Sequence, residues 1–65
     1  MREHDVVRLK REVEGMVPGT MGTVMIVSPD IPGKILVEFS DPNGEEILLI
    51  EVNKEDVDVA FKARP

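Results

Sequence analysis

Short segments in which apolar and polar residues alternate recur along the chain, and glycine and proline separate them, which is the pattern of an all-β protein. In residues 6–11, Val7 and Leu9 are expected on one face and Arg8 and Lys10 on the other. Further strands are predicted at residues 20–28, 34–39, 45–52 and 58–62, with one short helical turn at 53–57. The pattern therefore predicts five strands with a short 3₁₀ turn before the last one.

Glycine and proline indicate how these strands are connected. They interrupt residues 12–19, and a first loop of this length is typical of SH3-like barrels. The Asn43-Gly44 pair suits positive φ and predicts a hairpin turn. Gly22 opens the second strand, where alanine would destabilise the chain if the glycine has a positive φ. These features predict one domain over residues 1–65, a small five-stranded SH3-like β-barrel.

One face of each strand is expected to form the core. The residues assigned to it are Val7, Leu9, Val24, Ile26, Ile35, Val37, Phe39, Ile47 and Leu49. Residues 47–50 are apolar on both faces, so the second face must meet something other than water. Leu48 and Ile50 are expected to point outward and to form an exposed apolar strip with Leu36 and Met25. Such strips usually mark interfaces.

The predicted strip leads to the first functional hypothesis, which is association with a protein. An acidic rim would be formed by Glu45, Glu46, Glu51 and Asp56. Either a protein partner or a second copy of the chain, as a homodimer, could cover the strip. The alternative is that the C-terminal residues Val59 and Phe61 fold across the strip and bury it within the same molecule. The sequence leaves these arrangements open.

The 65 residues carry a formal net charge of -5 and include no cysteine, which fits a reducing compartment and predicts a cytoplasmic protein. No apolar run approaches the roughly 20 residues that cross a bilayer, so no membrane contact is expected. Residues 38–58 hold eight carboxylates and one lysine, an arrangement that would repel phosphate. The only basic cluster consists of Arg8, Lys10 and Arg11.

This basic cluster supports a second hypothesis, a nucleic-acid-binding module. Residues 19–24, with two glycines before a β-branched strand, resemble the glycine-bearing strand of KOW motifs, which are small barrels of ribosomal and transcription proteins. RNA recognition by such modules uses basic and aromatic side chains. Here Phe39 and Phe61 are the only aromatic residues and the net charge is negative. Protein association is therefore favoured, and nucleic-acid binding is the alternative.

The side chains that catalysis needs are scarce. His4 is the single histidine and lies near the N-terminus, while Ser28 and Ser40 fall at turns, where a hydroxyl commonly bonds the local backbone. The sequence contains no phosphate-binding loop motif and no complete set of metal ligands at a suitable spacing. It therefore predicts a non-enzymatic protein without catalytic residues, metal or cofactor.

Several short motifs occur in an order that is similar to that of one known family. They are Asp5-Val6-Val7, the segment 18–24, Val37-Glu38-Phe39-Ser40-Asp41, Asn43-Gly44 and Glu55-Asp56-Val57. In this order they resemble the domain of unknown function 4926 family of short prokaryotic proteins. The resemblance implies a compact SH3-like barrel without assigned catalytic residues, and it suggests an accessory or antitoxin-like partner of another protein. The chain departs from the family pattern after Val57, where the family often has Leu-Arg-Pro.

Overall fold

A computed structural model describes residues 1–40, 44 and 46–64 of the chain. Within these residues the secondary structure consists of five strands and one short 3₁₀ turn. They are β1 (Val6–Leu9), β2 (Met21–Val27), β3 (Lys34–Ser40), β4 (Ile47–Asn53), η1 (Lys54–Asp56) and β5 (Val57–Phe61). The five predicted strands and the turn before the last strand are confirmed, with bounds that differ from the expected ones by at most two residues.

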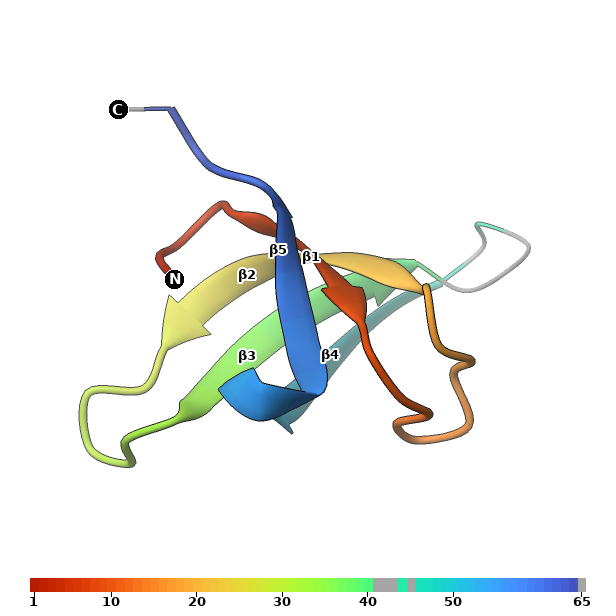
Figure 1. Ribbon diagram of the computed structural model, residues 1–65, viewed down its shortest axis with the longest axis horizontal. Coiled ribbons are helices and arrows are strands. Elements are labelled where there is room, and N and C mark those ends of the chain that lie inside the picture. Colours follow the sequence, from red (N-terminus) through yellow and green to blue (C-terminus); the bar gives the residue numbers. More distant parts are fainter. Residues whose placement is uncertain (41–43, 45, 65) are drawn as a thin grey trace.

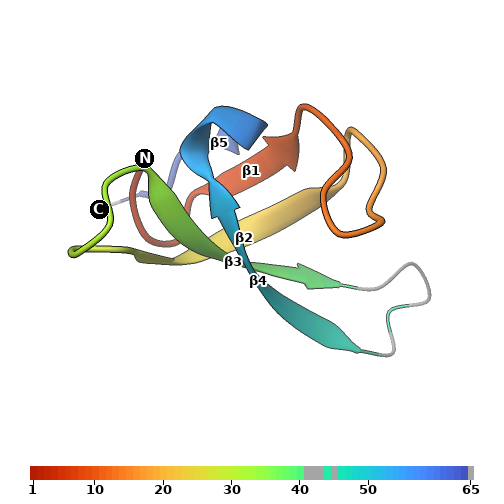
Figure 2. The ribbon, with the colours of Figure 1, turned by 90° about the horizontal axis from the view of Figure 1, so that it is seen from below.

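The strands form one antiparallel sheet in the order β4-β3-β2-β1-β5 (Figure 1). Each of β1, β2 and β3 pairs with the next strand along the chain, whereas β5 returns to pair with β1. The β3–β4 hairpin twists away from the β1–β5 pair, as the perpendicular view shows (Figure 2). The all-β class is confirmed. The strand pairs of the described residues leave β4 and β5 as edges and do not close the sheet into the predicted barrel.

The pairing of β3 with β4 decides which residues of β4 face the core. Phe39 lies opposite Leu48, and Val37 lies opposite Ile50. Because directly opposite residues share a face, Leu48 and Ile50 lie on the inner side with the buried Phe39 and Val37. The prediction that Leu48 and Ile50 point outward is therefore wrong. A run that is apolar on both faces does not reveal its own orientation, which the register with β3 sets instead.

Three residues that were expected in the core lie on the outer face of the sheet. Ile47 and Leu49 alternate with the inner residues of β4 and are 65% and 59% exposed. Ile26 is 49% exposed, and the β2–β3 register shifts between Val24 and Ile26, which makes Met25 an extra residue in the strand. Such a β-bulge reverses the alternation beyond it, so Ile26 faces outward although Val24 is buried.

Eight buried apolar side chains form the core of the described residues. They are Val7, Leu9, Val24, Ile35, Val37, Phe39, Val52 and Val57. The alternation predicts six of them. Val52 joins the core because β4 presents its even-numbered residues inward, and Val57 joins it because β5 places it opposite the buried Leu9 of β1.

Gly22 lies in β2 at a point where the neighbouring strand is very close. A Cβ atom on this residue would lie 2.6 Å from Val37 Cγ1, 2.7 Å from Phe39 Cδ1 and 2.8 Å from the Glu38 carbonyl oxygen. The φ angle of Gly22 is outside the left-handed region. Close packing, and not a positive φ, therefore requires glycine here.

The hairpin turn predicted between β3 and β4 is described only in part. Gly44 has a φ of 73°, in the left-handed region that the turn prediction assigns to it. Asn43, with the rest of residues 41–43, and Glu45, the expected first residue of the fourth strand, lie outside the described residues.

The Asp5 carboxylate connects the two ends of the chain. It is 2% exposed; its Oδ2 accepts a hydrogen bond from the Arg2 backbone N–H at 3.0 Å, and its Oδ1 accepts one from the Ala63 N–H at 2.6 Å. The Ala63 hydrogen bond is the main cause that lowers the pKa of Asp5. The Arg2 amide and the positive charges of the N-terminus and of Arg2 also lower this pKa, while burial acts against them. The folded state therefore favours the ionised carboxylate.

We expect Asp5→Asn to lower the melting temperature at pH 7, because a neutral amide accepts weaker hydrogen bonds than a carboxylate. Since the pKa of Asp5 is lower in the folded state, its stabilisation is complete above the unfolded value of about 4 and is lost as the pH falls through the folded value. Thermal melts should thus show the difference from wild type shrinking below about pH 4. Glu3→Gln, at an exposed position, is the control. An unchanged melting temperature of Asp5→Asn at pH 7 would contradict this role.

Candidate interaction surfaces

The outer face of the sheet carries apolar side chains that solvent reaches. We call this patch the outer apolar face. It consists of Ile47 and Leu49 on β4, Ile26 on β2 and Leu36 on β3, which is half-buried. Leu36 lies opposite Ile26 across the β2–β3 pair, and Leu49 is its diagonal neighbour across the β3–β4 pair. Ile47 follows on the same side of β4. These four side chains therefore form one patch that crosses three strands.

Carboxylates alternate with the apolar side chains on this patch. Glu38 lies opposite Leu49, and Glu51 lies opposite Leu36. Glu46, just before β4, is also exposed. The outer apolar face therefore has carboxylates at its centre and its end, which favours contact with a basic surface.

The residues of the predicted strip are divided between the two faces of the sheet. Leu36 belongs to the outer apolar face, and Met25 is half-buried at the bulge. Ile50 packs against the core, and Leu48 is 36% exposed on the inner side of β4. Phe61, expected in a tail that covers the strip, is instead 64% exposed on β5, the edge strand opposite to β4. Val59, the other residue of that tail, is half-buried and packs against the core, as Ile50 does. In the described residues β5 pairs with β1, and Phe61 covers none of the predicted strip.

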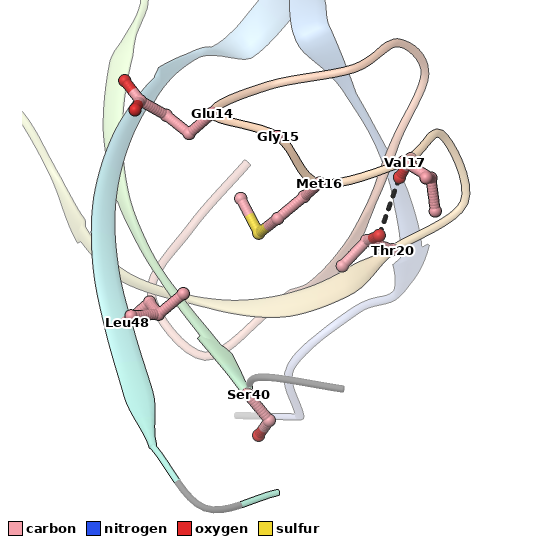
Figure 3. Close-up of a pocket in the computed structure, with 7 residues that line it drawn as sticks. All are labelled: Glu14, Gly15, Met16, Val17, Thr20, Ser40 and Leu48. Atoms are coloured by element: carbon pink, nitrogen blue, oxygen red, sulfur yellow. Dashed lines mark hydrogen bonds between the residues drawn. The ribbon is translucent and has the colours of Figure 1, made fainter. Parts of the chain in front are cut away.

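A hollow of about 410 Å³ opens on the inner side of β4 (Figure 3). Its lining residues are Glu14, Gly15, Met16, Val17, Thr20, Ser40 and Leu48. Val13 and Met16 exchange two backbone hydrogen bonds, which fold the first loop back on itself. The side chains of Met16 and Leu48 point toward one another across the hollow (Figure 3). The loop and the edge strand therefore enclose a mainly apolar space.

No pattern in the sequence predicts the hollow. The loop is shaped by a left-handed Glu14-Gly15 pair, with φ angles of 51° and 81°, and by a hydrogen bond from Thr20 Oγ1 to the Val17 carbonyl oxygen at 2.7 Å. The composition of residues 12–19 predicts a long loop and nothing about what it contacts. The hollow depends on a contact between this loop and β4 that no local pattern encodes.

The three cations considered for nucleic-acid binding lie beside carboxylates. Lys10 Nζ is 3.5 Å from Asp58 Oδ1, and Arg11 Nη1 is 3.3 Å from Asp56 Oδ1. Arg8 is exposed and lies opposite Asp58 in the β1–β5 pair. Ion pairs between exposed groups contribute little stability. Their effect here is to place a negative charge next to each cation of the cluster.

The described residues contain no group of three or more His, Cys, Asp or Glu side chains that could hold a metal ion. His4 is exposed, and its backbone N–H donates a hydrogen bond to the Val24 carbonyl oxygen. The Ser28 hydroxyl oxygen accepts a hydrogen bond from the Ile31 N–H at 3.1 Å, as predicted for a turn residue. Ser40 lines the hollow. In the part of the chain that the structure describes, no helix has the length and apolar composition needed to cross a membrane.

Comparison of the chain with protein-family models, with curated proteins and with solved structures found no match in any of the three. The resemblance to the domain of unknown function 4926 family therefore stays a prediction from the sequence motifs.

Proposed function

We propose that this protein is a non-enzymatic, cytoplasmic interaction module with an SH3-like barrel fold, and that it acts as an accessory partner of another protein. The outer apolar face carries the proposal, because Ile47 and Leu49 are 65% and 59% exposed on it. Exposed apolar side chains that form a contiguous patch commonly mark interaction sites. The long first loop and the 3₁₀ turn before β5 support the SH3-like assignment.

The charges favour a partner whose surface is basic and apolar. Glu38 and Glu51 lie in the outer apolar face, the exposed Glu46 precedes Ile47 in the chain, and the whole chain has a net charge of -5. A second copy would bring the same carboxylates together, and facing like charges destabilise an interface. A basic partner would pair with these carboxylates while removing the apolar side chains from water.

Photo-crosslinking from within the outer apolar face tests this proposal. With benzoylphenylalanine in place of Leu49, we expect ultraviolet light to join the full chain to one protein in its native cells. The same group in place of Phe61 is the control, since Phe61 has a similar exposure, 64% against 59%, and lies on the opposite edge strand. Serine at Leu36 and Ile47 should abolish the product formed from position 49.

Other results of the photo-crosslinking would change or remove this proposal. A product that joins two copies, together with a dimer in analytical ultracentrifugation, would replace the separate partner with a homodimer. Equal products from positions 49 and 61 would remove the outer apolar face as the binding surface, and so would a product that survives the serine substitutions.

Nucleic-acid binding through Arg8, Lys10 and Arg11 is the alternative hypothesis. Asp56 and Asp58 lie beside these cations. No observation in the described residues favours this hypothesis over protein association, so protein association is the function that we propose.

A further inference from the structure

The first half of β4 presents a free edge. Residues 47–50 pair with β3 on one side, and within the described residues their backbone makes no other hydrogen bond. Three of these four side chains are exposed. An edge with unpaired N–H and C=O groups is a template onto which another strand can add.

The two edges of the sheet differ in how readily they could accept a strand. β4 pairs with β3 over seven residues without a register shift, and it contains neither proline nor lysine, the residues that commonly protect an edge. β5 has five residues, and its register with β1 shifts between Val6 and Val7. β4 is therefore the longer and more regular edge.

The hollow adjoins the inner side of this edge. Leu48 forms part of the wall and faces inward from the free segment 47–50. A strand added beside β4 would place a side chain roughly 5 Å from that of Leu48. Met16 lies on the other side of the space (Figure 3). A volume of about 410 Å³ is in the range of small-ligand pockets and accommodates an aliphatic side chain.

The charges near this edge are negative. Glu51 is exposed on the outer side of β4, Glu38 lies on the same side opposite Leu49, and Glu46 precedes β4. No lysine or arginine is among the described residues that line the hollow. An added strand with its apolar residues on the inner side would present its alternate lysine or arginine residues to Glu38 and Glu51 on the outer side, whereas the β4 of a second copy would repeat Glu46 and Glu51.

We propose that β4 captures an extended protein segment in which apolar and basic residues alternate. The segment adds as a strand along residues 47–50 and inserts one apolar side chain between Met16 and Leu48. This inference rests on the proposed function, because it names the class of partner. Main-chain hydrogen bonds supply affinity in such complexes, and side-chain pockets supply specificity.

A seven-residue, end-blocked peptide of alternating lysine and valine, labelled with fluorescein, is the probe. We expect it to bind the full chain in anisotropy titrations, with an affinity that decreases as salt increases. In a strand, alternate amides point to the same side, so N-methylation of one alternate set should weaken binding about tenfold or more and methylation of the other should not. Hydrogen exchange should show new protection at residues 47–50.

Two lysine substitutions of equal charge test the hollow. Val17 is 65% exposed and lines it, whereas Ile31 is 51% exposed and precedes β3 in another loop. Val17→Lys should weaken peptide binding several-fold, and Ile31→Lys should leave it close to wild type. Strand addition is overturned by any of three results: no binding at low salt, equal binding of the two methylated peptides, or new protection at β5 and not at β4.

The peptide titration and the photo-crosslinking separate the two proposals. Loss of peptide binding with an intact product from position 49 would remove strand addition and leave the proposed function in place. Loss of both would remove both. Peptide binding without a crosslinked product would remove the outer apolar face and support the free edge of β4 as the binding element.

Discussion

Phe39→Ala is expected to lower the free energy of unfolding by about 3–5 kcal/mol. Phe39 is the largest of the fully buried side chains and lies on β3 between Gly22 of β2 and Leu48 of β4. A core in a domain of this size rarely supplies more than about 3–5 kcal/mol in total. The truncation should therefore leave a large part of the population unfolded without denaturant.

Phe61→Ala is the matched control for this experiment. Phe61 is the only other aromatic residue and is 64% exposed, so its loss should change the free energy of unfolding by no more than about 0.5 kcal/mol. The chain has no Trp or Tyr, so urea unfolding is best followed by far-ultraviolet circular dichroism. Equal losses from the two variants would contradict the packing described here.

Gly22→Ala is expected to cost about 3 kcal/mol, at the upper end of the range for overpacked sites. The added Cβ would overlap two core side chains, Val37 and Phe39, and the carbonyl oxygen of Glu38. A side chain can rotate away from an intruding methyl group, but the carbonyl oxygen belongs to the paired backbone of β3. The strands would have to separate locally, which would weaken their hydrogen bonds.

Gly15→Ala separates this packing effect from a backbone effect. No atom lies within 4 Å of a Cβ built on Gly15, but its φ is 81°. Alanine there should cost about 1 kcal/mol, from strain alone. Urea unfolding of both variants gives the comparison. A stability of Gly22→Ala equal to that of wild type would show that β2 and β3 are further apart than described.

The sequence was sufficient to locate the strands because the signals for strand ends are local. Glycine and proline interrupt the chain between strands, and the alternation in β1 and β3 assigns buried positions such as Val7, Leu9 and Val37 correctly. The polar residues after Val52 predict a short 3₁₀ turn, and η1 confirms this prediction.

The side of the sheet on which a side chain lies could not be predicted where it depends on the pairing of two strands. Residues 47–50 are apolar at every position, so only the register with β3 decides that Leu48 and Ile50 face inward. The bulge at Met25 likewise reverses the orientation of Ile26 without any sign in the alternation. The sequence predicts an exposed apolar patch that contains Leu48 and Ile50. The structure has an exposed apolar patch, but on β4 it contains Ile47 and Leu49 instead.

Neither the hollow nor the role of Asp5 could be predicted from the sequence, for a different reason. Both depend on groups far apart in the chain, Met16 with Leu48 in one case and Asp5 with Ala63 in the other. A charged residue just before a strand is expected to be exposed. The burial of Asp5 is explained only by the two backbone N–H groups that donate hydrogen bonds to its carboxylate.

The strand order also determines how much chain entropy is lost when each pair of strands forms. The β3–β4 pair begins at Ser40 and Ile47, whereas the β1–β5 pair begins at Leu9 and Val57, which closes a loop about seven times longer. Closing that longer loop costs roughly 2 kcal/mol more. Pairing of β2, β3 and β4 is therefore expected to cost less chain entropy than pairing of β5 with β1. A state in which only β2, β3 and β4 are paired would already present the free edge of β4 and the outer apolar face.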